Sequence, residues 1–386
     1  MLRNELIVCF STVSWDFLWQ RHHEVMTRFA RAGNRVLFVD PIGVRMVQWR
    51  DAHRIVARLQ NRRRAGKRGI RQVIPNVWVM DPLVNPLQEI EFVHRRNVTA
   101  LTRQVQNAIA QLGGGKPILW TYAPTRLAYD VIARLAHKLV VYECVDAMTA
   151  NPKGVLRSLA ASEEKLSRGA DVVLVTSRAL LERHLPLNPS TYYVPHGVEY
   201  DLFADDTAPE PATLAAIPHP RLAFFGSIDE RVDFELLARL AQQHPAWHIV
   251  LLGLARVSIA ALQKFPNIHF LGLVAHKQVP AYLHAMDVLL MPYLPIEFSQ
   301  YLNPLKLQEC FAVGKPTVVY ALPAFEEYRS VLRIAATADE YEALVQDALR
   351  EPKNAPQIEQ RRACACANTW DARFAEINAR VQAHLL

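Results

Sequence analysis

The sequence has few cysteines, no metal-binding spacing and no long apolar run. No uninterrupted apolar stretch approaches the roughly 20 residues of a membrane span, and the first residues do not resemble a signal peptide. No histidine pair has the spacing of a metal site, so no metal is expected. These features predict a soluble, cytoplasmic protein. The five cysteines are interpreted as reduced packing residues: Cys9, Cys144, Cys310, Cys364 and Cys366.

Glycine is missing where a dinucleotide-binding protein needs it. A strand at 6–10, a helix at 20–32 and a strand at 35–41 form a predicted βαβ opening. The loop between the first strand and the helix, 11–19, contains no glycine, whereas a dinucleotide fingerprint requires several there. Asp40 is therefore not predicted to bind an NAD ribose, which argues against an oxidoreductase.

The pattern that is present is a repeated alternation of short apolar strands and helices. It occurs in both halves of the 386 residues, and the halves are separated by a polar, proline-bearing stretch at 205–212. We expect two doubly wound α/β domains, 1–204 and 205–365. The predicted strands after the opening are 117–121, 139–146, 171–177, 221–227, 248–253, 268–272 and 288–293.

The most informative stretch predicts a short helix between two strands. Asn303 can cap this helix, Pro304 suits its first position, and Gly314 can end it before a β-branched strand. Lys306 and Glu309 are three residues apart and share one face near the N-terminal end, where backbone N–H groups favour an anion. The lysine would bind the diphosphate of a sugar nucleotide, and the glutamate would accept hydrogen bonds from the ribose hydroxyls. The alternative is a solvated surface ion pair.

Asp146 ends the predicted strand 139–146, and ligands of open α/β sheets collect beyond the carboxyl ends of strands. It is a candidate general base for an acceptor hydroxyl. The alternative is that Asp146 caps the following helix.

Residues 44–72 are strongly basic, with ten arginines and lysines against the single acid Asp51. Apolar residues recur there at rough helical spacing, with Trp49 beside arginines, as in a helix that lies on an anionic membrane. A basic helix that covers the sheet is the alternative. Nucleic-acid binding is less favoured, because the remaining chain shows no recognition module.

Several segments carry a resemblance to one family. Asn-Pro-Leu-Lys-Leu-Gln-Glu-Cys-Phe-Ala-Val-Gly-Lys-Pro at 303–316 resembles the nucleotide-binding segment of GT-B glycosyltransferases. Val-Val-Tyr-Glu-Cys-Val-Asp at 140–146 is similar to the strand that ends in the proposed catalytic aspartate of xanthan-type glucuronosyltransferases, and 192–203 looks like the segment that closes the first GT-B domain. The chain looks most like teichuronic-acid and xanthan-type transferases.

The resemblance implies roles for ten residues. Asp146 would be catalytic, and no metal or other cofactor would be needed. Arg231 could instead pair with Asp229 or Asp233, and Tyr293 could be a core aromatic. The donor would contact Gly226, Ser227, Arg231, Tyr293, Lys306 and Glu309, and the acceptor would contact Tyr122, Arg126 and His196.

One position departs from the family pattern. The large retaining branch of GT-B enzymes has an acid eight positions before the last glutamate, and that position is Tyr301 here. The motif therefore does not assign the chain to that branch.

The resulting expectation is a GT-B enzyme with two domains facing across a cleft and a C-terminal helix, 366–386, that crosses back to the first. It would move a sugar from a nucleoside-diphosphate sugar, a UDP-sugar, to a lipid-linked or polysaccharide acceptor. It would work as a peripheral protein on the inner face of the cytoplasmic membrane, through 44–72. The alternatives are a sugar-nucleotide 2-epimerase and a non-catalytic scaffold on the same fold.

Overall fold

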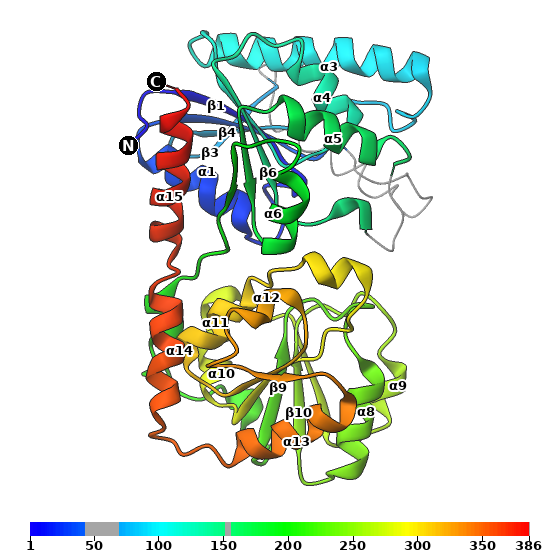
Figure 1. Ribbon diagram of the computed structural model, residues 1–386, viewed down its shortest axis with the longest axis vertical. Helices are drawn as coiled ribbons and strands as arrows, with labels where there is room; N and C mark the ends of the chain where they lie inside the picture. Colours follow the sequence, from blue (N-terminus) through cyan, green and yellow to red (C-terminus); the bar gives the residue numbers. More distant parts are fainter. Residues whose placement is uncertain (43–68, 151–155, 386) are drawn as a thin grey trace. The chain divides into compact units, whose positions relative to one another are not determined.

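The computed structural model describes residues 1–42, 69–150 and 156–385 (Figure 1). The chain divides into two compact units. The first comprises Met1–Val194 together with Phe374–Leu386, and the second comprises Pro195–Arg373. The chain thus changes unit after Val194, whereas the sequence placed the boundary between residues 204 and 205.

The first unit is built on an eight-stranded sheet with the order β3-β4-β2-β1-β5-β6-β7-β8. All neighbouring strands are parallel except β3 and β4, which are antiparallel. The strand order reverses between β1 and β5. The strands are β1 (Leu6–Phe10), β2 (Arg35–Val39), β3 (Arg71–Ile74), β4 (Val77–Met80), β5 (Ile118–Thr121), β6 (Leu139–Cys144), β7 (Val172–Val175) and β8 (Thr191–Tyr193).

Helices cover both faces of this sheet, which is why β1 is an unbroken apolar run that is buried throughout. On one face α1 (Arg21–Arg31) packs with α15 (Trp370–Ala383), where the ring centroids of Phe29 and Phe374 are 4.9 Å apart. The chain terminus therefore completes the core of the first unit. Figure 1 shows three neighbouring helices on the opposite face, namely α3 (Glu91–Gln111), α4 (Arg126–Ile132) and α5 (Leu159–Gly169). The helix α6 (Arg178–His184) follows strand β7 in the chain.

The second unit is built on a six-stranded, fully parallel sheet with the order β11-β10-β9-β12-β13-β14. Its strand order reverses between β9 and β12. The strands are β9 (Arg221–Phe225), β10 (His248–Leu252), β11 (Ile268–Gly272), β12 (Val288–Met291), β13 (Thr317–Tyr320) and β14 (Arg333–Ala335). The helices are α7 (Tyr200–Ala204), α8 (Phe234–Gln243), α9 (Ala260–Gln263), α10 (Val279–His284), α11 (Lys306–Val313), α12 (Pro323–Glu326), α13 (Ala338–Leu349) and α14 (Pro356–Cys366).

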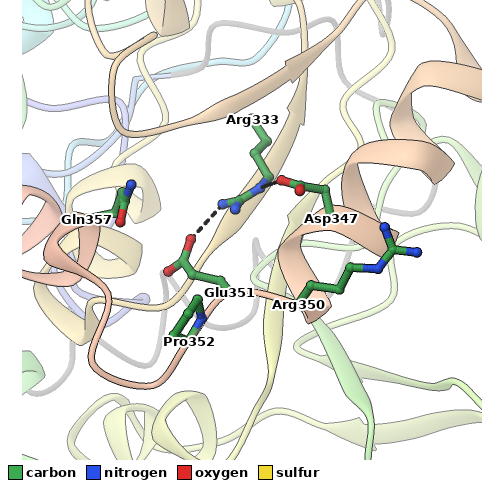
Figure 2. Close-up of a pocket in the computed structure, with 6 residues that line it drawn as sticks. All are labelled: Arg333, Asp347, Arg350, Glu351, Pro352 and Gln357. Carbon is green, nitrogen blue, oxygen red and sulfur yellow. Dashed lines mark hydrogen bonds and ion pairs between the residues drawn. The ribbon is translucent and has the colours of Figure 1, made fainter.

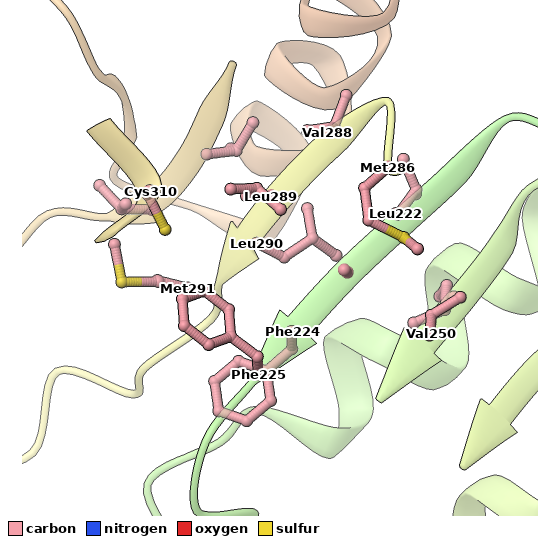
Figure 3. Packing of buried hydrophobic residues seen from close by; sticks show 14 of the residues in the cluster. Leu222, Phe224, Phe225, Val250, Met286, Val288, Leu289, Leu290, Met291 and Cys310 are labelled. Atoms are coloured by element: carbon pink, nitrogen blue, oxygen red, sulfur yellow. The ribbon is translucent and has the colours of Figure 1, made fainter. Parts of the chain in front are cut away.

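The core of the second unit is the apolar layer around β9 and β12 (Figure 3). Phe224 and Leu290 are fully buried there, and Cys310 from α11 packs into the same layer. The predicted pair of doubly wound α/β sheets is confirmed by the two strand orders. Within the described residues, no helix has the length and apolar character needed to cross a membrane.

Candidate active site

The strand order of the second unit identifies where a ligand should bind. In an open parallel sheet, ligands bind beyond the carboxyl ends of the strands at the point where the strand order reverses. That point lies between β9, which is followed by Gly226, and β12, which is followed shortly by Tyr293. Lys306 at the start of α11 reaches the same place, because its Nζ lies 5.3 Å from the centroid of the Tyr293 ring.

Lys306 is held at this reversal by backbone and aromatic groups. Its Nζ donates a hydrogen bond to the carbonyl oxygen of Phe225 at 2.5 Å and lies 4.5 Å from the centroid of the Phe224 ring. Both contacts favour a cation, because a carbonyl oxygen and the face of an aromatic ring are electronegative. A positive charge is therefore fixed at the carboxyl end of β9.

Two glycines make room for this lysine. Gly226 has a φ of 112°, and a Cβ there would lie 2.2 Å from Nζ of Lys306. Gly253, at the end of the neighbouring strand β10, has a φ of 138°, and a Cβ there would lie 1.8 Å from the carbonyl oxygen of Gly226. Gly226 was predicted from the sequence, whereas Gly253 was missed, although a glycine directly after a strand was a usable signal.

Ser227 and Arg231 belong to the turn after β9. The hydroxyl of Ser227 is buried. The guanidinium of Arg231 forms a bidentate pair with Asp229, with Nε 2.8 Å from Oδ1 and the second nitrogen 2.7 Å from Oδ2. Burial alone would raise the pKa of Asp229, but the hydrogen bonds and charge of Arg231 outweigh it and lower that pKa. Of the two predicted partners of Arg231, the structure selects Asp229.

Tyr293 is both a core aromatic and a neighbour of the two cations. Its side chain is buried, and its ring meets that of Phe224 edge to face at 5.9 Å. The guanidinium carbon of Arg231 lies 5.6 Å from the centroid of the same ring. Tyr293 therefore belongs to the core and also lies against both cations of the candidate site.

Glu309 lies half-buried in the first turn of α11, and its pKa is shifted by its surroundings. Burial raises its pKa, and Glu199 adds to this, while His276 and Lys306 act in the opposite direction. In the described part of the chain, no hydrogen bond or ion pair to the Glu309 carboxylate is found, and the surface ion pair with Lys306 that the sequence left open is not formed. A carboxylate in this state can accept hydrogen bonds from ligand hydroxyls.

Glu199 and His276, beside Glu309, were not predicted as site residues. Nε2 of His276 lies 2.8 Å from a carboxylate oxygen of Glu199. Glu199 comes just before α7 and His276 after β11, so only the tertiary fold joins them to the start of α11. No sequence spacing could have linked them.

The predicted start of α11 is wrong, and its predicted end is confirmed. Asn303 and Pro304 lie before the helix, which begins at Lys306 with Leu305 as its cap. The N–H of Leu307 bonds to the carbonyl oxygen of Pro304 at 3.0 Å, so a tighter turn precedes the α-helical bonds. Gly314 ends the helix with a φ of 80°. Lys306 and Glu309 consequently both stand in the first turn, nearer to the free N–H groups.

In the first unit, Asp146 lies in the loop after β6. It is half-buried, and its backbone carbonyl accepts from the N–H of Met148 at 2.8 Å, at the start of the 3₁₀ turn Met148–Ala150. This places the carboxylate beyond the carboxyl end of a central strand, as the sequence predicted from the strand pattern.

The three predicted acceptor residues have different surroundings. Tyr122 is buried, and burial together with the nearby Glu143 carboxylate raises its pKa. Arg126 is half-buried and pairs with Glu91 at 2.9 Å between nitrogen and oxygen. His196 belongs to the second unit and packs its buried ring near Trp370, with centroids 6.4 Å apart.

A histidine that the sequence did not select lies at the strand-order reversal of the first unit. The ring of His22 is 3.9 Å from that of Tyr122, between centroids, and Nε2 of His22 is 3.0 Å from the hydroxyl of Thr12. Burial, followed by the charges of His23 and Arg21, lowers the pKa of His22 well below its usual value. The imidazole is therefore neutral near pH 7.

Two other clusters do not form ligand sites. Cys144, Glu163 and His184 lie within 4.8 Å of one another. Glu163, however, already accepts from the hydroxyl of Tyr142 at 2.9 Å and from Arg183 at 2.6 Å. The arginine charge opposes a metal cation, so we interpret this group as a hydrogen-bonded core.

The second cluster lines a cavity of about 190 Å³ (Figure 2). Arg333 spans it with ion pairs of 2.8 Å to Asp347 and 2.9 Å to Glu351. Arg333 begins β14, so the cavity lies at the amino edge of the sheet, opposite the carboxyl ends that carry Lys306.

Comparison with known proteins decides the class. Residues 219–350 match the family described as glycosyl transferases group 1. The protein carries a group 1 glycosyltransferase domain. This domain contains Gly226, Lys306 and Glu309, the residues assembled at the strand-order reversal.

Relatives and solved structures agree with this glycosyltransferase assignment. TuaH of Bacillus subtilis (strain 168), a glycosyltransferase assigned to teichuronic acid biosynthesis, is 27% identical over 274 residues, which are 66% of this chain and 68% of TuaH. The fold is similar to sucrose-phosphate synthase from Thermosynechococcus elongatus, with a TM-score of 0.69, 16% identity and 98% coverage of both chains. It is also similar to Anabaena HepE in complex with UDP-glucose, with a TM-score of 0.65, 13% identity and coverage of 98% and 99%. The glycosyltransferase has the GT-B fold.

Proposed function

We propose that the glycosyltransferase transfers a sugar from a UDP-sugar to a hydroxyl of a lipid-linked or polysaccharide acceptor, without a metal. The single observation that carries this proposal is the placement of Lys306 beside Gly226 at the strand-order reversal of the second unit. The UDP-glucose complex of HepE, which shares the fold, supports a UDP-sugar as the donor.

Each donor group has a proposed partner. Lys306, together with the N–H groups at the start of α11, faces the diphosphate, and Arg231 contributes as an ion pair with Asp229. The Glu309 carboxylate accepts from the ribose hydroxyls, because no other described group bonds to it. Gly226 and Ser227 supply backbone close to the phosphates.

The proposed reaction is a displacement at the anomeric carbon. The acceptor oxygen forms a bond to that carbon, and the bond from the carbon to the diphosphate oxygen breaks. The diphosphate leaves with the electron pair, stabilised by Lys306 and the helix terminus. In an inverting reaction, Asp146 takes the proton of the acceptor hydroxyl. Tyr122, Arg126 and His196 remain proposed acceptor contacts.

The acceptor and the cellular location are inferred from a relative and from the charge of the sequence. TuaH is named for teichuronic acid biosynthesis, which favours a glycan acceptor. The basic stretch 44–72 favours a place on an anionic membrane, although of this stretch only residues 69–72 lie within the described part of the chain. We propose that the enzyme works on the inner face of the cytoplasmic membrane.

The proposal is tested first by thermal unfolding with UDP, GDP and ADP. A ligand at about 100 times its dissociation constant adds roughly 2.7 kcal/mol to the stability, so UDP should raise the unfolding temperature measurably. Lys306→Ala should abolish that shift, and Glu309→Gln should reduce it.

The matched control is Lys264→Ala. Lys264 also lies over an aromatic ring of the second unit, 5.2 Å from the centroid of Phe265, but it is remote in sequence from the site motif. An equal UDP shift in wild type and Lys306→Ala would reject the donor site. A UDP shift without transfer to any glycan acceptor would favour the epimerase, and no shift at all would favour the scaffold.

A further inference from the structure

Two histidines from neighbouring strands of the second unit lie in direct contact. Nδ1 of His248 on β10 is 3.0 Å from Nε2 of His269 on β11, and the two rings are tilted by 31° with their centroids 5.3 Å apart. The two residues are 21 positions apart in the chain, so no short sequence spacing indicated the pair. Imidazole nitrogens are the commonest metal ligands in proteins, which makes this pair a candidate metal site.

The sheet holds the two side chains on one face. His269 is in register with Val250, and His248 lies two residues before Val250, so all three side chains project to the same side of the sheet. Between the two histidines the strands are hydrogen-bonded, because the N–H of Ile249 donates to the carbonyl oxygen of Asn267 at 2.8 Å. Paired strands rather than loops therefore bring the two ring nitrogens together.

The distance between these nitrogens fits a single shared ion. Bonds from histidine nitrogen to a metal such as zinc are about 2.0–2.1 Å long. An ion bound at that length to both nitrogens, which are 3.0 Å apart, makes an angle of about 90° to 100° with them. Neighbouring ligands of square-planar and octahedral ions meet at such angles, whereas tetrahedral zinc requires a wider one. The geometry therefore favours Ni²⁺ and Cu²⁺ over Zn²⁺.

The hydrogen bond between the two rings is compatible with metal binding. A neutral imidazole carries one N–H, so one of the facing nitrogens donates and the other accepts. When the donating ring moves its proton to its other nitrogen, both facing nitrogens present lone pairs to the ion, and no proton is gained or lost. Both side chains are half-buried, so water can complete the coordination of the ion.

The nearest described cation in register with the pair is already compensated. Arg221 on β9 is in register with His248. Its guanidinium pairs with Glu210 at 3.0 Å and donates to backbone carbonyl oxygens, and among the described contacts it bonds to neither histidine. Arg183 differs, because it bonds directly to the Glu163 carboxylate of the buried cluster in the first unit. Arginine therefore competes for a ligand atom there, but not at the histidine pair.

We propose that His248 and His269 together bind one divalent transition-metal ion, Ni²⁺ or Cu²⁺. The second histidine binds an ion that the first already holds, and this intramolecular step makes the pair tighter than a lone histidine. The ion joins the edge strand β11 to β10 and stabilises the second unit. His248 begins β10, so the site lies at the amino edge of the sheet, opposite the carboxyl ends that carry Lys306. It takes no part in the proposed transfer reaction.

Isothermal titration of the metal-free full chain with Ni²⁺ tests the proposal. His248→Gln and His269→Gln should each weaken the tightest Ni²⁺ site at least about tenfold, because each removes one of two ligands. Saturating Ni²⁺ should raise the unfolding temperature of wild type and not that of either variant. The matched control is His137→Gln, a lone half-buried histidine of the first unit whose Nδ1 lies 2.7 Å from the carbonyl oxygen of Leu135. It should bind Ni²⁺ as wild type.

A second measurement reports the ligands without reference to stability. The electron paramagnetic resonance spectrum of bound Cu²⁺ should show two coupled nitrogens in wild type and fewer in His248→Gln and His269→Gln. Equal Ni²⁺ affinity in wild type and both variants, an equal loss in His137→Gln, tighter binding of Zn²⁺ than of Ni²⁺, or an unchanged Cu²⁺ spectrum in the variants would each overturn the site. The UDP-induced shift in unfolding temperature should be the same in His248→Gln as in wild type, so a failure of the donor proposal is detected separately.

Discussion

At the scale of single residues, the proposed roles depend on the surroundings of each side chain. Lys306 lies beside a carbonyl oxygen and aromatic rings, burial raises the pKa of Glu309, and burial lowers the pKa of His22. These surroundings suit the proposed contacts to a leaving diphosphate, to a pair of hydroxyls and to a proton, respectively. Two residues of the first unit, Asp146 and His22, therefore compete for the role of base.

Replacement of Asp146 by Asn distinguishes them. If Asp146 is the base, the variant should bind UDP as wild type and lose transfer by roughly 10²- to 10⁴-fold, because an amide cannot take the proton. The measurement is the transfer rate at saturating donor, with the UDP-induced shift in unfolding temperature as the folding control. Normal turnover in Asp146→Asn, together with loss in His22→Asn, would move the role to the histidine.

Asp40 predicts a dependence of stability on pH. Burial raises its pKa from 3.8 to about 6, despite the hydrogen bonds from Ser14 and Trp15. Between these two pH values the folded state binds more protons than the unfolded state, so the free energy of unfolding falls as the pH rises. Because the pKa is raised by about two, Asp40 changes the free energy of unfolding by at most about 3 kcal/mol across this range.

His184 acts with the opposite sign in nearly the same pH range. Burial, followed by the charge of Arg183, lowers its pKa from 6.5 to about 4, so the unfolded state binds more protons and stability rises with pH. Asp40→Asn should therefore make the free energy of unfolding rise more steeply between pH 4 and 6, measured by urea titration. An unchanged slope would contradict the proposed titration of Asp40.

At the scale of elements, the proposed donor site is a junction of two strand ends and one helix end. The carboxyl ends of β9 and β12 and the amino end of α11 converge, and the backbone must approach closely for Lys306 to lie among them. Gly226→Ala tests this junction. The new Cβ would lie 2.2 Å from Nζ of Lys306, and φ is 112°.

We expect Gly226→Ala to displace the Lys306 side chain and to weaken UDP binding at least tenfold, in addition to about 1 kcal/mol or more of backbone strain. Isothermal titration with UDP measures the affinity. Gly33→Ala is the control, because Gly33 also has a positive φ, 95°, but a Cβ there would have no atom within 4 Å. If both variants bind UDP equally well, close approach at Gly226 is not required.

At the scale of the whole molecule, the chain is two units with separate cores. The proposed donor ligand would contact only the second unit, whose described residues include the matched family region 219–350. Hydrogen exchange should therefore show UDP-dependent protection at the ends of β9 and β12 and at the start of α11, and little change in the sheet of the first unit. Strongest protection around β1 and β5 would instead locate the nucleotide in the first unit.

The sequence by itself determined what depends on local pattern. Buried parallel strands have to be apolar throughout, so their positions, the two doubly wound sheets and the glycine that ends α11 could be predicted. Lys306 and Glu309 were predicted as a pair because a spacing of three residues places them on one helical face, and both lie in the first turn of α11. The helix start was missed because Asn303 and Pro304 fit a cap equally well before a tighter turn.

Only the tertiary structure decided what depends on contacts between distant segments. Gly253 matters because its backbone lies against that of Gly226, and Glu199 and His276 matter because their charges act on Glu309. Arg231 pairs with Asp229, which is one of the two acids that the sequence offered. Strand order sets these neighbours, and strand order is fixed by packing of the whole sheet rather than by any one segment.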